Sequence, residues 1–303
     1  MYHQHFGLNE SPFSLTPDTE YFFNYASHCD ALNTLLAAIK MGEGFIKVVG
    51  EVGTGKTLLC RSVLKMLGDD IVTAYIPNPM LTSNELREAL ADELGLSVEQ
   101  DQDRDPHRLL KRIYRELVRL RSEGKKIVLL IDEAQAIPNS TLEALRLLTN
   151  LETEKYKLLQ VVLIGQPELD ERLKRQSVRQ LKQRITFSCE LELIDRNSID
   201  GYVLHRLNVA GYSGARLFSS RAISLLAKAS RGVPRIINVL CHKALMSAYG
   251  QGQARVDIKH VRDAIKDTEV AQSRRHHNWQ LADIGLSVCV LIGLGLVYVG
   301  TAS

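Results

Sequence analysis

The chain has 303 residues, 45% hydrophobic and 24% charged, and its 38 basic and 35 acidic residues give a formal net charge of +3. These ordinary globular values exclude wholesale disorder, collagen-like repetition and a strongly basic nucleic-acid-binding chain. The five cysteines are scattered without a C-x-x-C pair, which favours a reducing compartment over a disulfide framework or a zinc site. The length predicts about two domains.

The first two thirds of the chain alternate apolar runs with helical patterns. Strands are predicted at residues 44–50, 71–76, 127–131, 158–164 and 185–191, and helices between them at 56–67, 83–94, 106–123 and 140–151. This alternation predicts a parallel sheet with right-handed crossovers. Only helical patterns follow, at 198–209, 219–229, 234–249 and 257–271. We therefore predict a domain boundary near residue 193.

A phosphate-binding loop is predicted after the first strand. The segment GEVGTGKT, residues 50–57, matches G-x-x-x-x-G-K-[ST] at every fixed position. Its glycines let backbone N–H groups point at phosphate oxygens, and the following helix adds positive potential. Lys56 is expected to reach the β- and γ-phosphates of ATP, and the Thr57 hydroxyl to bind Mg²⁺. The predicted nucleotide-binding residues are Gly50, Glu51, Val52, Gly53, Thr54, Gly55, Lys56, Thr57 and Leu58.

Two carboxylates follow the apolar strand at residues 127–131. Asp132 is expected to hold Mg²⁺, directly or through water, and Glu133 to orient and polarise the attacking water. The glycine-rich loop and this acidic pair together predict ATP hydrolysis with Mg²⁺.

The C-terminal run 284–300 contains no charged residue and would span about 25 Å as a helix, near the shortest length that crosses a bilayer core. Arg274 and Arg275 precede it, and aromatic residues lie near both of its ends, as expected for a span whose N-terminal side is cytoplasmic. The pattern predicts a basic linker at 273–283, a single transmembrane helix in a bacterial inner membrane and a cytoplasmic segment 1–280. A buried C-terminal helix of a soluble core is the alternative.

Five motifs in order carry a family resemblance: GEVGTGKT, IVLLIDEAQ, VLIGQPEL, QLKQRI and RGVPRIINVLCHKAL. Over roughly residues 1–270 the chain resembles the AAA+ ATPases of the general secretion pathway protein A (ExeA) type, especially the shorter ATPases of mannose-sensitive haemagglutinin (type IV) pilus biogenesis. The resemblance implies an α/β AAA+ P-loop NTPase domain with a parallel five-stranded sheet at 1–193 and an α-helical lid domain at 194–272. The periplasmic peptidoglycan-binding domain of the longer relatives is not carried over.

The resemblance also implies roles for individual residues. Gln166 corresponds to the sensor that contacts the γ-phosphate and the attacking water, and Arg235 to the sensor arginine of the lid. Arg184 corresponds to the arginine finger that reaches a neighbouring subunit's site in a homo-oligomer or ring, with Arg179 as its rival. Residues 21–28 would form part of the adenine pocket. The alternatives are a polar turn residue for Gln166 and a surface helix cap for Arg235.

Three functions remain open from the sequence. The first is a membrane-anchored ATPase that acts with envelope proteins to drive or regulate assembly of a type IV pilus or type II secretion machine. The second is a DNA-acting AAA+ adaptor of the transposition or origin-recognition type, suggested by basic stretches at 104–126 and 172–184. Nucleic acid is the less favoured partner, because solvated helix faces or a charged subunit interface also explain such stretches. The third is a non-hydrolysing scaffold, against which Lys56, Glu133 and Arg184 argue.

Overall fold

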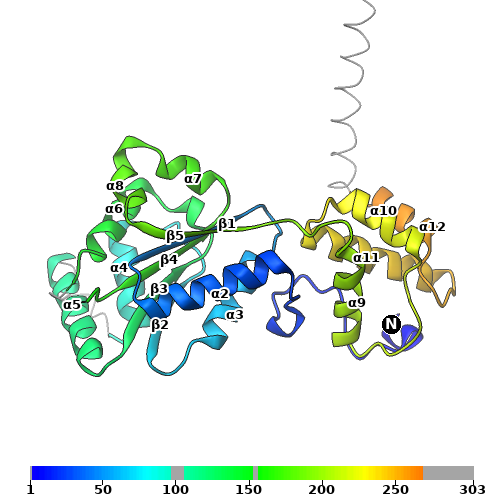
Figure 1. The fold of residues 1–303 in the computed structure, drawn as a ribbon, viewed down its shortest axis with the longest axis horizontal. Coiled ribbons are helices and arrows are strands. Elements are labelled where there is room, and N and C mark those ends of the chain that lie inside the picture. Colours follow the sequence, from blue (N-terminus) through cyan, green and yellow to red (C-terminus); the bar gives the residue numbers. More distant parts are fainter. Residues whose placement is uncertain (1, 97–105, 153–155, 269–303) are drawn as a thin grey trace, which may run out of the picture. The chain divides into compact units, whose positions relative to one another are not determined.

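A computed structural model describes residues 2–96, 106–152 and 156–268 (Figure 1). The chain divides into two compact units, which we describe separately. Of the described residues, the sheet unit comprises those within 16–194, and the helical unit combines residues 2–15 with residues 195–268.

The sheet unit contains five parallel strands in the order β2-β3-β4-β1-β5, which confirms the predicted parallel five-stranded sheet. The strands are β1 (Phe45–Gly50), β2 (Ile71–Ile76), β3 (Lys126–Ile131), β4 (Gln160–Gly165) and β5 (Ile185–Leu191). Strand β3 lies inside the sheet, between β2 and β4, and is buried over its last five residues, as expected of an apolar strand covered on both faces.

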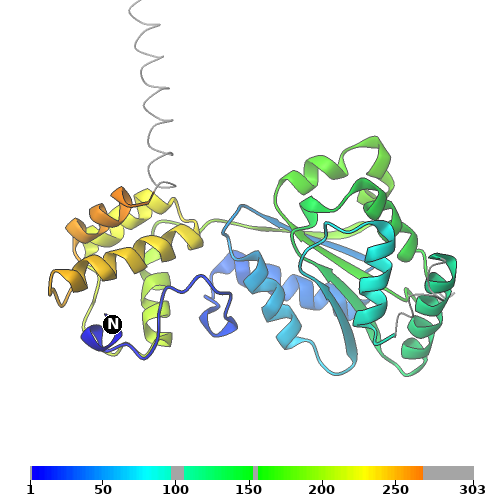
Figure 2. The same ribbon diagram turned by 180° about the vertical axis from the view of Figure 1, so that it is seen from behind.

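Helices cover both faces of this sheet (Figures 1 and 2). Helices α2 (Ala26–Met41) and α3 (Lys56–Met66) pack with alternate strand residues such as Val128 and Leu130 on one face. Helices α4 (Ser83–Glu93), α5 (Pro106–Ser122) and α6 (Asn139–Leu148) pack on the other face with the intervening residues, including Leu129. This alternation follows from the two-residue period of a strand. Helices α7 (Glu168–Leu173) and α8 (Arg179–Lys182) follow β4.

The register brings several strand ends to one edge of the sheet. Val49 of β1 is level with Gly165 of β4, and Ile131 of β3 is level with Leu163 of β4. The segments that follow β1, β3 and β4 therefore leave the sheet at the same edge. The segment after β3 continues into the short 3-10 turn η2 (Ala134–Ala136), and the segment after β4 continues into helix α7.

The helical unit contains α9 (Ile199–Val209), α10 (Ser220–Ser230), α11 (Pro234–Gly250) and α12 (Ile258–Lys266), together with α1 (Tyr2–Phe6). Its N-terminal segment is held by a buried arginine, since the Arg206 guanidinium donates to the carbonyls of Pro12, at 2.5 Å, and Ser14, at 3.2 Å. The hydroxyl of Tyr2 lies 3.1 Å from Nδ1 of His242 on α11.

The structural division differs in part from the expected domains. The chain passes from the sheet unit back to the helical unit between residues 194 and 195, next to the expected boundary at 193–194. The first 15 residues, however, group with the C-terminal helices instead of the sheet. The Tyr2 side chain contacts His242 on α11, and the backbone carbonyls of Pro12 and Ser14 accept from Arg206 on α9.

The predicted linker at 273–283 and transmembrane helix at 284–300 lie outside the described residues. Among the residues that the structure does describe, no helix combines the length and apolar character needed to cross a bilayer.

Candidate functional site

The glycine-rich loop joins β1 to α3, and its backbone requires glycine. Gly53 and Gly55 have φ angles of 82° and 100°, in the left-handed region that side chains with a Cβ rarely adopt. A Cβ on Gly50 would lie 2.9 Å from both Leu191 Cβ and Thr54 Oγ1. The loop therefore forms a tight main-chain turn immediately before the start of a helix, the arrangement that binds phosphate groups.

Lys56 is buried at the first residue of α3. Its ammonium group donates to the carbonyls of Gly50, at 2.8 Å, and Glu51, at 2.9 Å, and so lies across the loop. Burial lowers the pKa of this amine, whereas the negative charges of Glu133 and Asp132 raise it. The structure thus brings the predicted phosphate-binding lysine and both predicted carboxylates into electrostatic contact.

Oxygen ligands suited to Mg²⁺ converge from two elements. The Thr57 hydroxyl on α3 donates to Asp132 Oδ2 at 2.7 Å, and Asp132 Oδ1 accepts the backbone N–H of Glu133 at 2.8 Å. Asp132 is 2% exposed, and its burial raises the pKa of the carboxyl group. A hydroxyl and a buried carboxylate at a loop that fits phosphate match the donor set by which proteins hold Mg²⁺ beside a nucleotide. The residues present therefore fit this metal.

The predicted water-orienting residue lies in a network of amide side chains. Glu133 has a φ of 50°, and its Oε2 accepts from Nε2 of Gln166, at 3.1 Å, and from Nε2 of Gln135, at 2.5 Å. Gln166 follows β4, so this network joins the ends of two neighbouring strands. The motif IDEAQ contains Gln135, but the sequence carries no signal that would assign it a contact.

Histidine 28 supports the glycine-rich loop from α2. Its Nε2 lies 2.8 Å from the carbonyl oxygen of Thr54. Because a carbonyl can only accept, Nε2 carries the proton and donates. The ring is buried beside Phe22 and Tyr25, and burial lowers its pKa. Residues 21–28 were predicted to contribute to an adenine pocket, and the structure adds this direct contact with the phosphate side of the site.

The three candidate arginines occupy different positions. Arg184 is half-buried directly before β5, where its guanidinium lies 3.4 Å from both the carbonyl of Arg146 and the hydroxyl of Thr149. Arg179 is exposed at the first residue of α8. Arg235 is exposed at the second residue of α11 in the helical unit. Their expected roles as finger, rival finger and lid sensor remain predictions.

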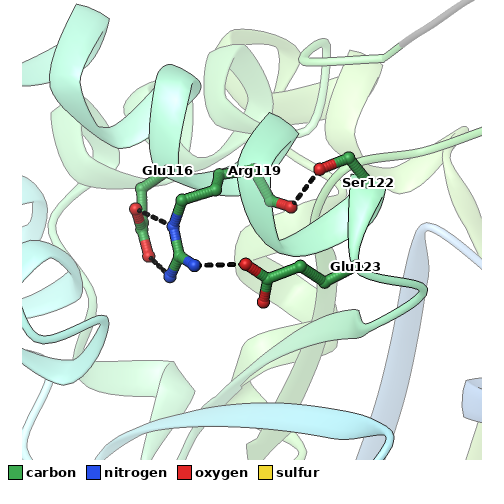
Figure 3. Close-up of polar contacts among 4 residues, drawn as sticks. All are labelled: Glu116, Arg119, Ser122 and Glu123. Atoms are coloured by element: carbon green, nitrogen blue, oxygen red, sulfur yellow. Dashed lines mark hydrogen bonds and ion pairs between the residues drawn. The ribbon is translucent and has the colours of Figure 1, made fainter.

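Several charges in the first basic stretch, residues 104–126, are engaged within the molecule. At the end of α5, the Arg119 guanidinium is paired with Glu116, at 2.5 Å, and with Glu123 (Figure 3). The guanidinium of Arg121 lies 4.3 Å from the ring centroid of Tyr156. These contacts agree with a solvated, internally paired helix end and do not add support for a nucleic-acid surface.

Comparison with known proteins agrees with this geometry. Residues 39–173 match the AAA domain family. General secretion pathway protein A of Aeromonas hydrophila is 42% identical over 296 residues, which cover 97% of this chain and 53% of that protein. The chain thus spans about half the length of this curated relative.

Solved structures share the fold at low sequence identity. Cdc6p of Pyrobaculum aerophilum matches with a TM-score of 0.66 and 16% identity, covering 85% of this chain and 70% of that one. The Thermotoga maritima RuvB Holliday junction branch migration motor matches with a TM-score of 0.53 and 18% identity, covering 79% and 67%. These likenesses show the fold alone. Residues 39–173 thus match an AAA domain, and the chain is similar to general secretion pathway protein A along almost its whole length.

Proposed function

We propose that this protein binds ATP with Mg²⁺ and hydrolyses it at the edge of the sheet where β1, β3 and β4 end. The observation that carries the proposal is the convergence of two pairs beside the glycine-rich loop. Thr57 and Asp132 form the first pair, and Glu133 and Gln166 form the second. The first pair has the chemistry of a metal site, and the second has the chemistry of a site for a water molecule.

Each part of the site has a separate task in this mechanism. The loop N–H groups and Lys56 hold the phosphates, and Thr57 and Asp132 would hold Mg²⁺. A magnesium ion held there would supply positive charge to offset the negative charge that develops on the phosphates. Glu133 orients the attacking water and accepts its proton, while Gln166 is positioned beside the same carboxylate to contact the water or the γ-phosphate.

Turnover requires a second copy of the chain. Arg184 acts as the arginine finger on a neighbouring subunit's phosphoryl group, with Arg179 as its rival, and Arg235 reports phosphate state to the lid. The support for this step is the resemblance of the motifs around Arg184, Arg179 and Arg235 to those of AAA+ ATPases, together with the match to an AAA domain. A homo-oligomer or ring is therefore the active form.

The cellular role follows the similarity to a general secretion pathway protein. The protein drives or regulates assembly of a type II secretion machine or, more narrowly, an MSHA-type IV pilus, through partners in the cell envelope. The uncharged run 284–300 and the preceding Arg274 and Arg275 support a single-pass anchor in the inner membrane, with residues 1–280 cytoplasmic. Resistance of the full chain to carbonate extraction, and its loss on truncation after Gln272, would support the anchor. Extraction of the full chain would contradict it.

The catalytic proposal is tested by Glu133→Gln. We expect this variant to bind ATP as the unmodified protein does, but to hydrolyse it at least about 10²-fold more slowly, because an amide cannot accept the proton of the water. Bound-nucleotide analysis should recover ATP from the variant and ADP from the unmodified protein. An unchanged hydrolysis rate would refute the assignment. In cells, loss of secretion or surface pili with Glu133→Gln would connect turnover to assembly.

A further inference from the structure

The side chain of Gln135 bridges the ends of β3 and β4. Its Nε2 donates to Glu133 Oε2 at 2.5 Å, while its Oε1 accepts the backbone N–H of Gln166 at 3.0 Å. One amide thus contacts both predicted members of the water site, the carboxylate through its donor end and the sensor backbone through its acceptor end. Gln135 is half-buried in the turn η2.

The main chain of Gln135 is fixed by α7. Arg172 donates to the carbonyls of Gln135 and Ile137, and also to Asn139 Oδ1 at 3.0 Å. Burial lowers the pKa of this guanidinium, with the charge of Arg175 as a smaller cause. The single side chain of Arg172 thus holds three points of the segment that follows Glu133.

The approach of Gln135 to β4 also depends on a glycine. A Cβ on Gly165 would lie 3.0 Å from Oε1 of Gln135 and 3.2 Å from its backbone nitrogen. Such contacts are tighter than most Cβ contacts, so a side chain at position 165 would require Gln135 to shift by a few tenths of an ångström. The close approach of β4, together with the contacts from α7, therefore favours this placement of Gln135.

We propose that Gln135 is a positioning residue that sets the orientation of the Glu133 carboxylate for the attacking water. The inference rests on the proposed ATPase function. Gln135 and Gln166 both donate to Oε2, which restricts rotation of the carboxylate and assigns Oε1 to the water. Misplacement of a reacting group by about 1 Å can slow a reaction about 10²-fold, so this restriction affects turnover strongly.

Because the donor and acceptor ends of the Gln135 amide have different partners, substitutions can distinguish positioning of Glu133 from a purely structural role. Gln135→Glu keeps the acceptor for the Gln166 N–H but replaces the donor by a negatively charged oxygen facing Glu133. Gln135→Ala removes both ends. If Gln135 is only a structural bridge, Gln135→Glu should retain a higher kcat than Gln135→Ala. If Gln135 positions the Glu133 carboxylate, Gln135→Glu should have the lower kcat.

The experiment measures kcat, the Kd for ATP with Mg²⁺ and the thermal midpoint of the full chain for both variants. We expect kcat to fall about 10²-fold in Gln135→Ala and further in Gln135→Glu, with Kd within about twofold of the unmodified value. Gln251→Ala, at an exposed glutamine of the helical unit, is the matched control and should leave kcat unchanged. If Gln135→Ala does not fold, Gln135→Met takes its place, because it keeps the side-chain length without either polar end.

Hydrogen exchange gives a readout that does not depend on activity. The Gln166 amide should exchange faster in Gln135→Ala and stay protected in Gln135→Glu, since only the second keeps the acceptor. A kcat for Gln135→Glu equal to or above that of Gln135→Ala would overturn the inference. Failure of the unmodified protein to hydrolyse ATP would instead refute the proposed function, whereas loss of hydrolysis in Glu133→Gln with no effect at position 135 would refute this inference alone.

Discussion

The glycine-rich loop of residues 50–57 and the strand-end network of Glu133, Gln135, Gln166 and Arg172 are built in different ways. The loop is a single contiguous segment whose shape depends on positive φ angles at Gly53 and Gly55. The network assembles side chains from two segments about 30 residues apart, through hydrogen bonds between amides, a carboxylate and a guanidinium.

This difference separates binding from turnover. A backbone cradle preceding a helix holds phosphate groups whatever the orientation of Glu133, so changes in the loop should alter ATP affinity. Changes in the network should alter the rate of hydrolysis at nearly constant affinity, because its carboxylate acts on the attacking water.

Arg184→Ala should reduce kcat by about 10³-fold and leave ATP affinity unchanged, since a finger supplied in trans stabilises the transition state alone. Mixing this variant with Lys56→Ala should restore part of the activity, because one competent interface can form from two defective chains. Arg179→Ala is the matched comparison and should retain activity. Confirmed mixed oligomers without recovery at any ratio would contradict a finger at position 184.

Lys56→Ala should weaken ATP binding by about 10- to 100-fold, because hydrogen bonds involving a charged group contribute about 1.5–3 kcal/mol. Titration with a fluorescent ATP analogue measures this change. Lys65→Ala, an exposed lysine on the same helix, is the control. Normal ATP affinity in Lys56→Ala, combined with slow hydrolysis, would show that Lys56 acts on hydrolysis and not on binding. That result would contradict the separation of binding from turnover.

His28→Ala should weaken ATP binding severalfold with little change in kcat. It removes the neutral hydrogen bond to the Thr54 carbonyl, which contributes about 1 kcal/mol to the loop conformation. His28→Gln keeps an N–H donor and should recover part of the affinity in the same titration. A fall in kcat with unchanged ATP affinity would contradict the role of His28 in supporting the phosphate-binding loop.

The smallest expected effect is an acid sensitivity of the fold. Burial lowers the pKa of His28 in the folded chain, so the unfolded chain binds more protons as the pH falls below about 6.5. This histidine therefore destabilises the protein on acidification and has no such effect at higher pH. Thermal midpoints should fall less on acidification in His28→Gln than in the unmodified protein. His107→Gln, at an exposed histidine, should show no such protection.

The parts of the fold encoded locally could be predicted. The loop at 50–57 and the carboxylates Asp132 and Glu133 were identifiable because spacing and neighbouring apolar residues define them within a few positions. Strand β3 begins one residue before its predicted start, and β4 is shifted by one or two residues. Helix α12 ends at Lys266, before the predicted residue 271, since the apolar pattern does not mark its end.

The parts built by contacts between distant segments could not be predicted. The position of β1 between β4 and β5 is set by packing of the whole sheet. The attachment of the N-terminal segment to the helical unit depends on Arg206, about 190 residues away. The contacts of Gln135 and Arg172 likewise depend on a turn after β3 and a helix after β4, so no local pattern marks either residue.

The most direct test of the separation is a single-turnover measurement on Gln166→Ala, with the Kd for ATP determined on the same preparation. Gln166 belongs to the network, and its side chain donates to Glu133. We expect Gln166→Ala to convert preloaded ATP to ADP at least about tenfold more slowly, with Kd within about twofold of the unmodified value. Weakened ATP binding with an unchanged single-turnover rate would contradict the separation.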